Sequence, residues 1–264
     1  MSTRHPHDDF GGISRDLPRL LGRRRFLALL GGAGAVAVAG CSGPGQPPGG
    51  GGAGGGEQVA AGTIPSETAG PYPGDGSNGP NVLDDAGVVR RDIRSSFGGT
   101  AATAEGVPMT IALTLTRGGA PMAGAAVYAW QCDRDGNYSL YADGLEDVNY
   151  LRGVQVADSA GKLEFQSIVP ACYDGRWPHV HVEVYSSPAD ATSSGNAVRT
   201  TQLALPKDMC DTVYATPGYE QSVRNLSRVS LDSDMVFSDG HDLQVATVTG
   251  TVSAGYTASL AVPL

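Results

Sequence analysis

Charged side chains and long apolar runs are both scarce in this chain of 264 residues. Only 17% of the residues are charged, and the formal net charge is -9. Six basic and three acidic residues precede Cys41, so the net charge of the remainder is -12. An acidic surface argues against binding to nucleic acid or to anionic lipid. The apolar run before Cys41 is shorter than the roughly 20 residues of a spanning helix.

Stretches that favour long helices are also few, whereas glycine and proline are common, at 38 and 17 residues. Hydrophobic residues make up 41%, enough for one sizeable core. Short runs alternate apolar and polar residues with the period of a strand. Separated by turn clusters, they predict an all-β sandwich or barrel with strands over residues 107–116, 125–132, 162–169, 179–185, 199–205, 243–252 and 256–262. Only residues 206–215 and 219–227 favour short helical turns.

The first 40 residues look like an export signal. Arg23, Arg24 and Arg25 precede an apolar run that ends in Val38-Ala39-Gly40-Cys41. This order resembles a twin-arginine signal joined to a bacterial lipoprotein cleavage box. Residues 1–40 are therefore predicted to be removed, leaving a lipid on Cys41 that anchors the protein at the outer face of the cell membrane. The alternative is an amphipathic or disordered tail that contains a chance cysteine.

A tether follows the predicted anchor. Between residues 42 and 56 nearly every residue is Gly, Pro, Ser or Gln, a composition that cannot bury a core. The predicted organisation is thus a signal over 1–40, an anchored linker over 41–62 and one folded domain over 63–264. Nothing in the sequence identifies an oligomer.

Histidine is rare beyond Cys41, yet His179 and His181 stand two residues apart in a predicted strand. Side chains two apart on a strand face the same way, so the two imidazoles form a candidate chelating pair. Two water-bound histidines on a strand are the alternative. Tyr138, Tyr173 and Arg176 lie near enough in sequence to strengthen the metal interpretation.

Between about Ile64 and Pro206 the sequence resembles the intradiol ring-cleavage dioxygenases, the family of catechol 1,2-dioxygenase and protocatechuate 3,4-dioxygenase. The resemblance is carried by Pro65-Ser-Glu-Thr-Ala-Gly-Pro-Tyr72, Ala126-Val-Tyr-Ala-Trp-Gln-Cys-Asp133, Gly136-Asn-Tyr138, Asn149-Tyr-Leu-Arg-Gly153, Pro170-Ala-Cys-Tyr173 and Arg176-Trp-Pro-His-Val-His181. It implies a β-sandwich that binds iron(III), takes a catechol and O2 as substrates, and yields a muconate-type diacid.

The resemblance also implies a role for each matching residue. Tyr138, Tyr173, His179 and His181 would bind the iron(III), and Tyr173 would leave it when the substrate binds. Arg176 would steady negative charge on the substrate ring. Gln202 matches a glutamine near that ring, although its spacing from His181 is longer than in the family.

Several alternatives stay open from the sequence. Glu183 shares the strand face of the histidines, so an iron(II) site of two histidines and one carboxylate is conceivable. The pair could also hold zinc or copper, or the domain could be a tethered binding module without turnover. Cys132, Cys172 and Cys210 allow at most one internal disulfide, or three buried thiols.

Overall fold

A computed structural model describes residues 62–264. The predicted signal over residues 1–40, Cys41 and the linker up to residue 61 lie outside the described residues. Among those described, none of the helices has the length and apolar character required to cross a bilayer.

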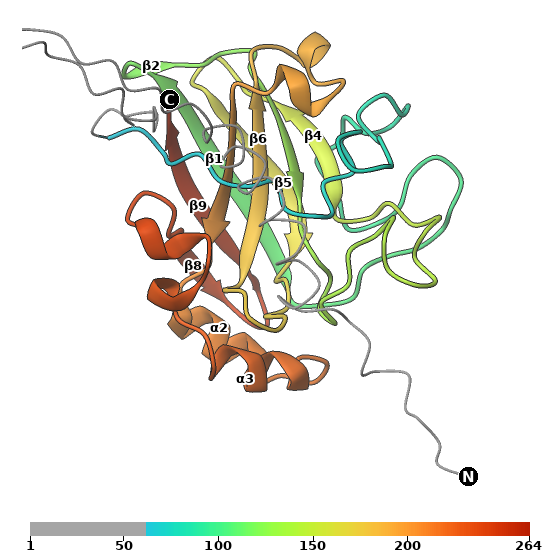
Figure 1. Ribbon diagram of the computed structural model, residues 1–264, viewed down its shortest axis with the longest axis vertical. Helices are drawn as coiled ribbons and strands as arrows, with labels where there is room; N and C mark the ends of the chain where they lie inside the picture. Colours follow the sequence, from blue (N-terminus) through green and yellow to red (C-terminus); the bar gives the residue numbers. More distant parts are fainter. Residues whose placement is uncertain (1–61) are drawn as a thin grey trace, which may run out of the picture.

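Two sheets form the body of the domain (Figure 1), which confirms the all-β sandwich prediction. The first sheet has the strand order β2-β1-β9-β8, with β5 also paired to β1. Its strands are β1 (Pro108–Arg117), β2 (Ala120–Pro121), β5 (Lys162–Ile168), β8 (Thr247–Thr251) and β9 (Gly255–Pro263). The second sheet has the order β4-β3-β6-β7, formed by β4 (Arg152–Val156), β3 (Ala126–Trp130), β6 (His179–Tyr185) and β7 (Arg199–Ala204).

The main core fills the space between the sheets. Ile111 and Leu113 of β1 point into it, and so do Val180 and Val182 of β6. Because side chains alternate along a strand, the residues between these valines face away from the main core. His179 and His181 therefore lie on the outer face of the second sheet.

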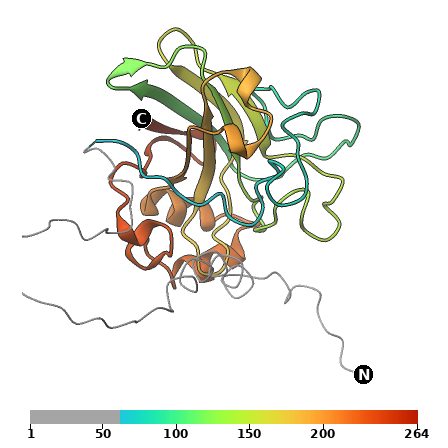
Figure 2. The ribbon, with the colours of Figure 1, turned by 45° about the horizontal axis from the view of Figure 1, so that its top comes forward.

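Loops cover that outer face and shield it from solvent. A second buried cluster joins Tyr128, Trp130 and Tyr185 of the sheet to Val82 and Val88 of the segment before β1. In Figures 1 and 2 this segment, coloured cyan to teal, runs from the C-terminal end of β9, where Ile64 N donates to Pro263 O at 2.8 Å, across to the side of β4. Both faces of β6 are consequently buried, which explains why all seven of its residues are buried.

The helices lie at one end of the sandwich (Figure 1), where Tyr214 and Tyr219 anchor them. The phenol of Tyr214 donates to Pro170 O at 2.9 Å, and that of Tyr219 to Val169 O at 2.8 Å. These helices are α2 (Lys207–Tyr214) and α3 (Glu220–Leu226), both predicted as helical turns. Short 3-10 turns occupy Pro188–Asp190, Ser194–Asn196, Leu231–Ser233 and Phe237–Asp239.

Two strand predictions need correction. The strand predicted over residues 243–252 begins only at Thr247, because Val245 makes a single bridge to Ala204 and the ladder does not continue. Strand β4 was not predicted, since it begins with a buried arginine, Arg152, followed by glycine. The three cysteines of the described residues are buried free thiols, so the alternative without a disulfide is the one observed.

Candidate metal centre

The two histidines are held rigidly by the middle of the second sheet. Strand β6 lies between β3 and β7, and the ring of His181 stacks on that of Trp130 at a centroid distance of 4.7 Å and an angle of 6°. His179 Nδ1 donates to Trp177 O, so His179 Nε2 carries a lone pair. The two Nε2 atoms are 3.1 Å apart.

Two phenols from separate loops meet these nitrogens. Tyr138 lies in the loop after β3, and its Oη is 3.2 Å from His181 Nε2. Tyr173 lies in the loop before β6, and its Oη is 3.4 Å from His179 Nε2. Tyr138 is buried, whereas Tyr173 is partly exposed. All four side chains predicted to bind metal are thus brought together.

The spacing of these four atoms suits a shared metal ion. Ligand atoms about 2.0–2.1 Å from one metal lie roughly 2.8–3.4 Å from one another at angles between 90° and tetrahedral. The separations of 3.1–3.4 Å between these atoms fall in that range. His179 Nε2 carries no proton, so its lone pair is able to bind a cation. The donor set therefore fits iron(III), which favours phenolate and imidazole ligands.

The protonation states favour binding of a strong cation over binding of a proton. Burial, reinforced by the charge of Arg176, lowers the pKa of His179 to about 3. Burial and the neighbouring His179 hold the pKa of His181 well below its usual value, so both rings are neutral at pH 7. Burial and the proximity of Tyr173 raise the pKa of Tyr138 well above 10. A phenolate here needs a highly charged metal beside it.

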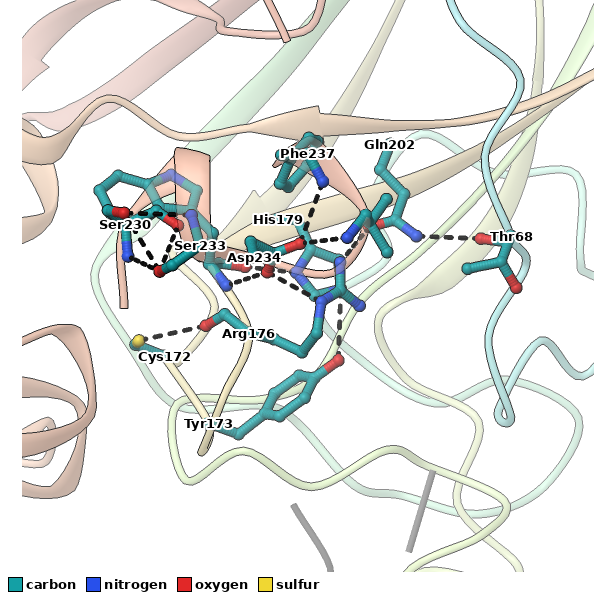
Figure 3. A network of polar contacts seen from close by, with 12 residues as sticks. Thr68, Cys172, Tyr173, Arg176, His179, Gln202, Ser230, Ser233, Asp234 and Phe237 are labelled. Carbon is teal, nitrogen blue, oxygen red and sulfur yellow. Dashed lines mark hydrogen bonds and ion pairs between the residues drawn. The ribbon is translucent and has the colours of Figure 1, made fainter. Parts of the chain in front are cut away.

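Arg176 and Gln202 lie next to the metal ligands and bind each other (Figure 3). Strand pairing places Gln202 of β7 directly opposite His181, despite the long connection between β6 and β7. Arg176 Nη2 donates to Gln202 Oε1 at 2.6 Å, and Gln202 Nε2 donates to Thr68 O at 2.9 Å. Arg176 Nε donates to Asp234 Oδ2 at 2.9 Å.

The segment before β1 packs over the centre. Gly70 has a φ of 71°, and a Cβ at this position would lie 3.4 Å from His181 Cε1. Two residues later, the ring of Tyr72 lies 5.1 Å from that of Tyr138. This close backbone approach helps to keep water from the ligands.

The alternative iron(II) site, formed by the two histidines and the carboxylate of Glu183, is not found among the described residues. Glu183 lies on the same face as the histidines, but its Oε2 accepts a hydrogen bond from Tyr185 Oη at 2.7 Å. Across the part of the chain that the structure describes, no group of three His, Cys, Asp or Glu side chains is placed to hold a metal. A site at this pair depends on the tyrosines.

Trp130 packs on His181 and Asp234 binds Arg176, but neither was singled out from the sequence. Trp130 lies opposite His181 in the β3 to β6 pairing, a contact that only the strand register reveals. Asp234 lies 53 positions beyond His181 in sequence number, in a stretch with no recognisable motif. A surface hollow of about 580 Å³ opens beside Pro65 and Asp239, and no predicted site residue lines it.

Glu67 should make stability depend on pH. Burial raises the pKa of this half-buried carboxyl from 4.5 to about 7, partly opposed by a hydrogen bond from Gln244. The folded state therefore retains a proton that the unfolded state loses above about pH 4.5, and stability should fall as pH rises from 4.5 to 7. Solvent screening limits the loss to less than about 1 kcal/mol.

Urea unfolding of the metal-free protein at pH 5 and pH 8 checks this expectation. Between pH 5 and pH 8, Glu67→Gln should lose less stability than the wild type, because it has no carboxyl group to ionise at this position. The exposed Glu146→Gln is the control and should follow the wild type at both values. An unchanged pH response in the Glu67 variant would contradict the expectation.

Comparison with known proteins agrees with this geometry. A dioxygenase family model matches residues 78–185, which include both tyrosines, Arg176 and both histidines. A 6-chlorohydroxyquinol 1,2-dioxygenase from Cupriavidus pinatubonensis is 35% identical over 124 residues, 45% of this chain and 40% of that protein. Residues 78–185 are thus similar to a dioxygenase domain, and the similar proteins include intradiol ring-cleavage dioxygenases. A chlorocatechol 1,2-dioxygenase from Rhodococcus opacus is 41% identical to this chain over 56 residues, 21% of this chain and 22% of that protein.

The fold of the described domain is shared with a solved structure. An intradiol ring-cleavage dioxygenase from Tetranychus urticae superposes with a TM-score of 0.58 at 21% identity, covering 76% of this chain and 93% of that one. The aligned regions span less than half the length of the curated relatives. The family match ends at residue 185, before Gln202 and Asp234.

Proposed function

We propose that this protein uses iron(III) and O2 to open the ring of a catechol between its two hydroxyl-bearing carbons. Both oxygen atoms would enter the product, a muconate-type diacid. The observation that carries the proposal is the convergence of two phenols and two neutral imidazoles within 3.1–3.4 Å. Tyr138, Tyr173, His179 and His181 would hold the metal. When bound, iron(III) would lower the pKa of the phenols and of the catechol hydroxyls.

The two tyrosines have different positions and hence different expected roles. Tyr138 is buried, and its ring packs against Tyr72, so it should remain in place throughout turnover. Tyr173 is partly exposed and lies on a loop. Its phenolate oxygen is therefore the candidate acceptor for a proton from an incoming catechol hydroxyl, after which the neutral phenol can move aside.

Arg176 would supply a fixed positive charge beside the reacting ring. Burial disfavours its charged form, but the neighbouring Tyr173 and Asp234 raise the pKa of Arg176, so the guanidinium stays protonated. A permanently charged donor can stabilise negative charge without competing for the metal. His179, His181 and Tyr138 are only 2%, 3% and 5% exposed, which limits the access of water to the ring of a bound catechol.

Colour and oxygen uptake together test the proposal. Phenolate bound to iron(III) absorbs visible light, so the iron-loaded protein should be red-brown, whereas a zinc protein or an empty binding module is colourless. Oxygen uptake is then measured with catechol, chlorocatechol, hydroxyquinol and protocatechuate. A coloured protein that takes up no oxygen with any of them would contradict turnover and favour the binding module.

We further propose that the enzyme works outside the cytoplasm, tethered by a lipid on Cys41. The order of the arginines, apolar run and small-residue box before Cys41 supports this. Cells fed a labelled fatty acid should label the wild-type protein and leave Cys41→Ala unlabelled. Label that persists in the variant would remove the anchor from the proposal.

A further inference from the structure

Asp234 is a buried carboxylate in which both oxygens are fully used. It is 0% exposed and lies between the 3-10 turns Leu231–Ser233 and Phe237–Asp239. Its Oδ1 accepts from Val236 N at 2.8 Å and from Phe237 N at 3.2 Å. Its Oδ2 accepts from Trp177 N at 2.6 Å and from Arg176 Nε at 2.9 Å. One oxygen thus shapes its own turn, and the other binds the loop that leads into β6 (Figure 3).

The same carboxylate determines how the Arg176 guanidinium is oriented. The Nε side of the planar group is bound to Asp234, and Nη2 is bound to Gln202 Oε1. Two bonds from different atoms of a rigid plane fix its rotation as well as its position.

We propose that Asp234 is a positioning residue that orients Arg176 toward the reacting ring of the substrate. The inference rests on the proposed function and adds to it a residue beyond the family match, in the C-terminal segment of the domain. Asp234 touches neither the metal ligands' donor atoms nor the substrate site directly. It acts through the guanidinium, which must face the ring when negative charge develops there.

The position of Asp234 next to Trp177 supports this role. Trp177 follows Arg176 in the chain, and its indole Nε1 donates to Leu205 O at 2.8 Å. The Asp234 carboxylate binds both Arg176 and the backbone of Trp177, so the arginine side chain and the loop that leads to His179 share one anchor. Phe237, in the next turn, places its ring 6.4 Å from that of His179.

Asp234→Asn tests the proposal, because the amide can still accept from Val236 N and Phe237 N through Oδ1. The Oδ2 acceptor becomes an amino donor, so the charge and the hydrogen bonds from Arg176 Nε and Trp177 N are lost. The expected result is a kcat about 10- to 100-fold lower, with KM changed less than about threefold, as for loss of an interaction made mainly in the transition state. Iron content and the visible band should stay at wild-type levels.

Two further variants separate positioning from a general structural effect. Asp232→Asn, exposed in the same segment, should leave kcat and KM unchanged. In an Arg176→Lys background, Asp234→Asn should add much less than its effect in the wild type, since both act through the guanidinium. If Asp234→Asn does not fold, Asp234→Glu keeps the charge, displaces the carboxylate by one methylene and carries the same expectation.

Hydrogen exchange at Arg176 Nε gives a readout that needs no turnover. Measured by NMR on the gallium(III)-loaded protein, this proton should be protected in the wild type and exchange at least about tenfold faster in Asp234→Asn. Wild-type kcat in the variant, additive losses with Arg176→Lys, or unchanged exchange would each overturn the inference. A wild type inactive on every catechol overturns the proposed function instead, and the exchange measurement still decides whether Asp234 orients the arginine.

Discussion

Tyr138→Phe should lose its iron and its colour while remaining folded. The variant removes one phenol oxygen, 3.2 Å from His181 Nε2, and keeps the ring that packs on Tyr72. Removing a residue that hydrogen-bonds to a metal ligand lowers metal affinity about 10- to 100-fold. Removing a ligand itself should therefore lower the affinity more than about 100-fold. Metal content after dialysis and the visible spectrum measure the effect. Oxygen uptake should fall with the bound iron.

The stability of the metal-free protein provides the control for this prediction. Without a metal, the Tyr138 phenol is hydrogen-bonded to His181 Nε2, and the net contribution of such a bond is about 1 kcal/mol. Urea unfolding of metal-free Tyr138→Phe should therefore differ little from the wild type. Tyr141→Phe, three residues further along, removes a phenol that accepts from Gly74 N and should keep both iron and colour. A Tyr138 variant that retains its iron would refute the ligand assignment.

The strands could be predicted where one face is apolar and the other is not. In β1 the apolar and polar residues alternate over ten positions, and the predicted strand lies within one residue of the observed one at each end. Strand β6 was also predicted with its observed bounds. Its histidines fit the alternating pattern of a strand, because their side chains point to the face opposite that of the core valines.

The parts that could not be predicted depend on contacts between distant segments. Arg152 begins β4, and nothing near it in sequence indicates a buried arginine. Asp234 and Asp232 stand two residues apart in similar surroundings, yet one is 0% exposed and the other is exposed. Only the packing of the C-terminal segment against the loop before β6 distinguishes them.

The covering loops explain why the metal centre lies on the outer face of a sheet and is still buried. Four strands alone would leave His179 and His181 in water, where their neutral forms would be less strongly favoured. The segment before β1 covers them, and backbone bonds such as that from Glu67 N to Thr200 O at 2.8 Å hold it to the sheet. Arg152 adds side-chain bonds to the carbonyls of Tyr72 and Pro73 in the same segment.

Arg152→Ala should therefore be the most destabilising single substitution considered. Arg152 is 0% exposed, and its guanidinium makes five hydrogen bonds. The acceptors are Tyr72 O at 3.0 Å, Pro73 O at 2.7 Å, Tyr128 Oη at 3.1 Å, Ser139 O at 2.8 Å and Ser139 Oγ at 3.0 Å. Breaking a buried polar network in this way costs about 3–5 kcal/mol, because the acceptors remain buried without partners.

Urea unfolding of the metal-free protein measures this loss, with Arg91→Ala as the matched control. Arg91 pairs with Glu164 on the surface, where both side chains are about half exposed, so its loss should change stability by less than about 0.5 kcal/mol. A loss below about 1 kcal/mol in Arg152→Ala would mean that the covering segment is held by other contacts. With the expected loss, iron binding should weaken as well, because Tyr72 packs on Tyr138 and its carbonyl is bound by Arg152. Arg152, a buried arginine that does not bind the metal, would then control both the packing of the segment before β1 and the retention of the metal beneath it.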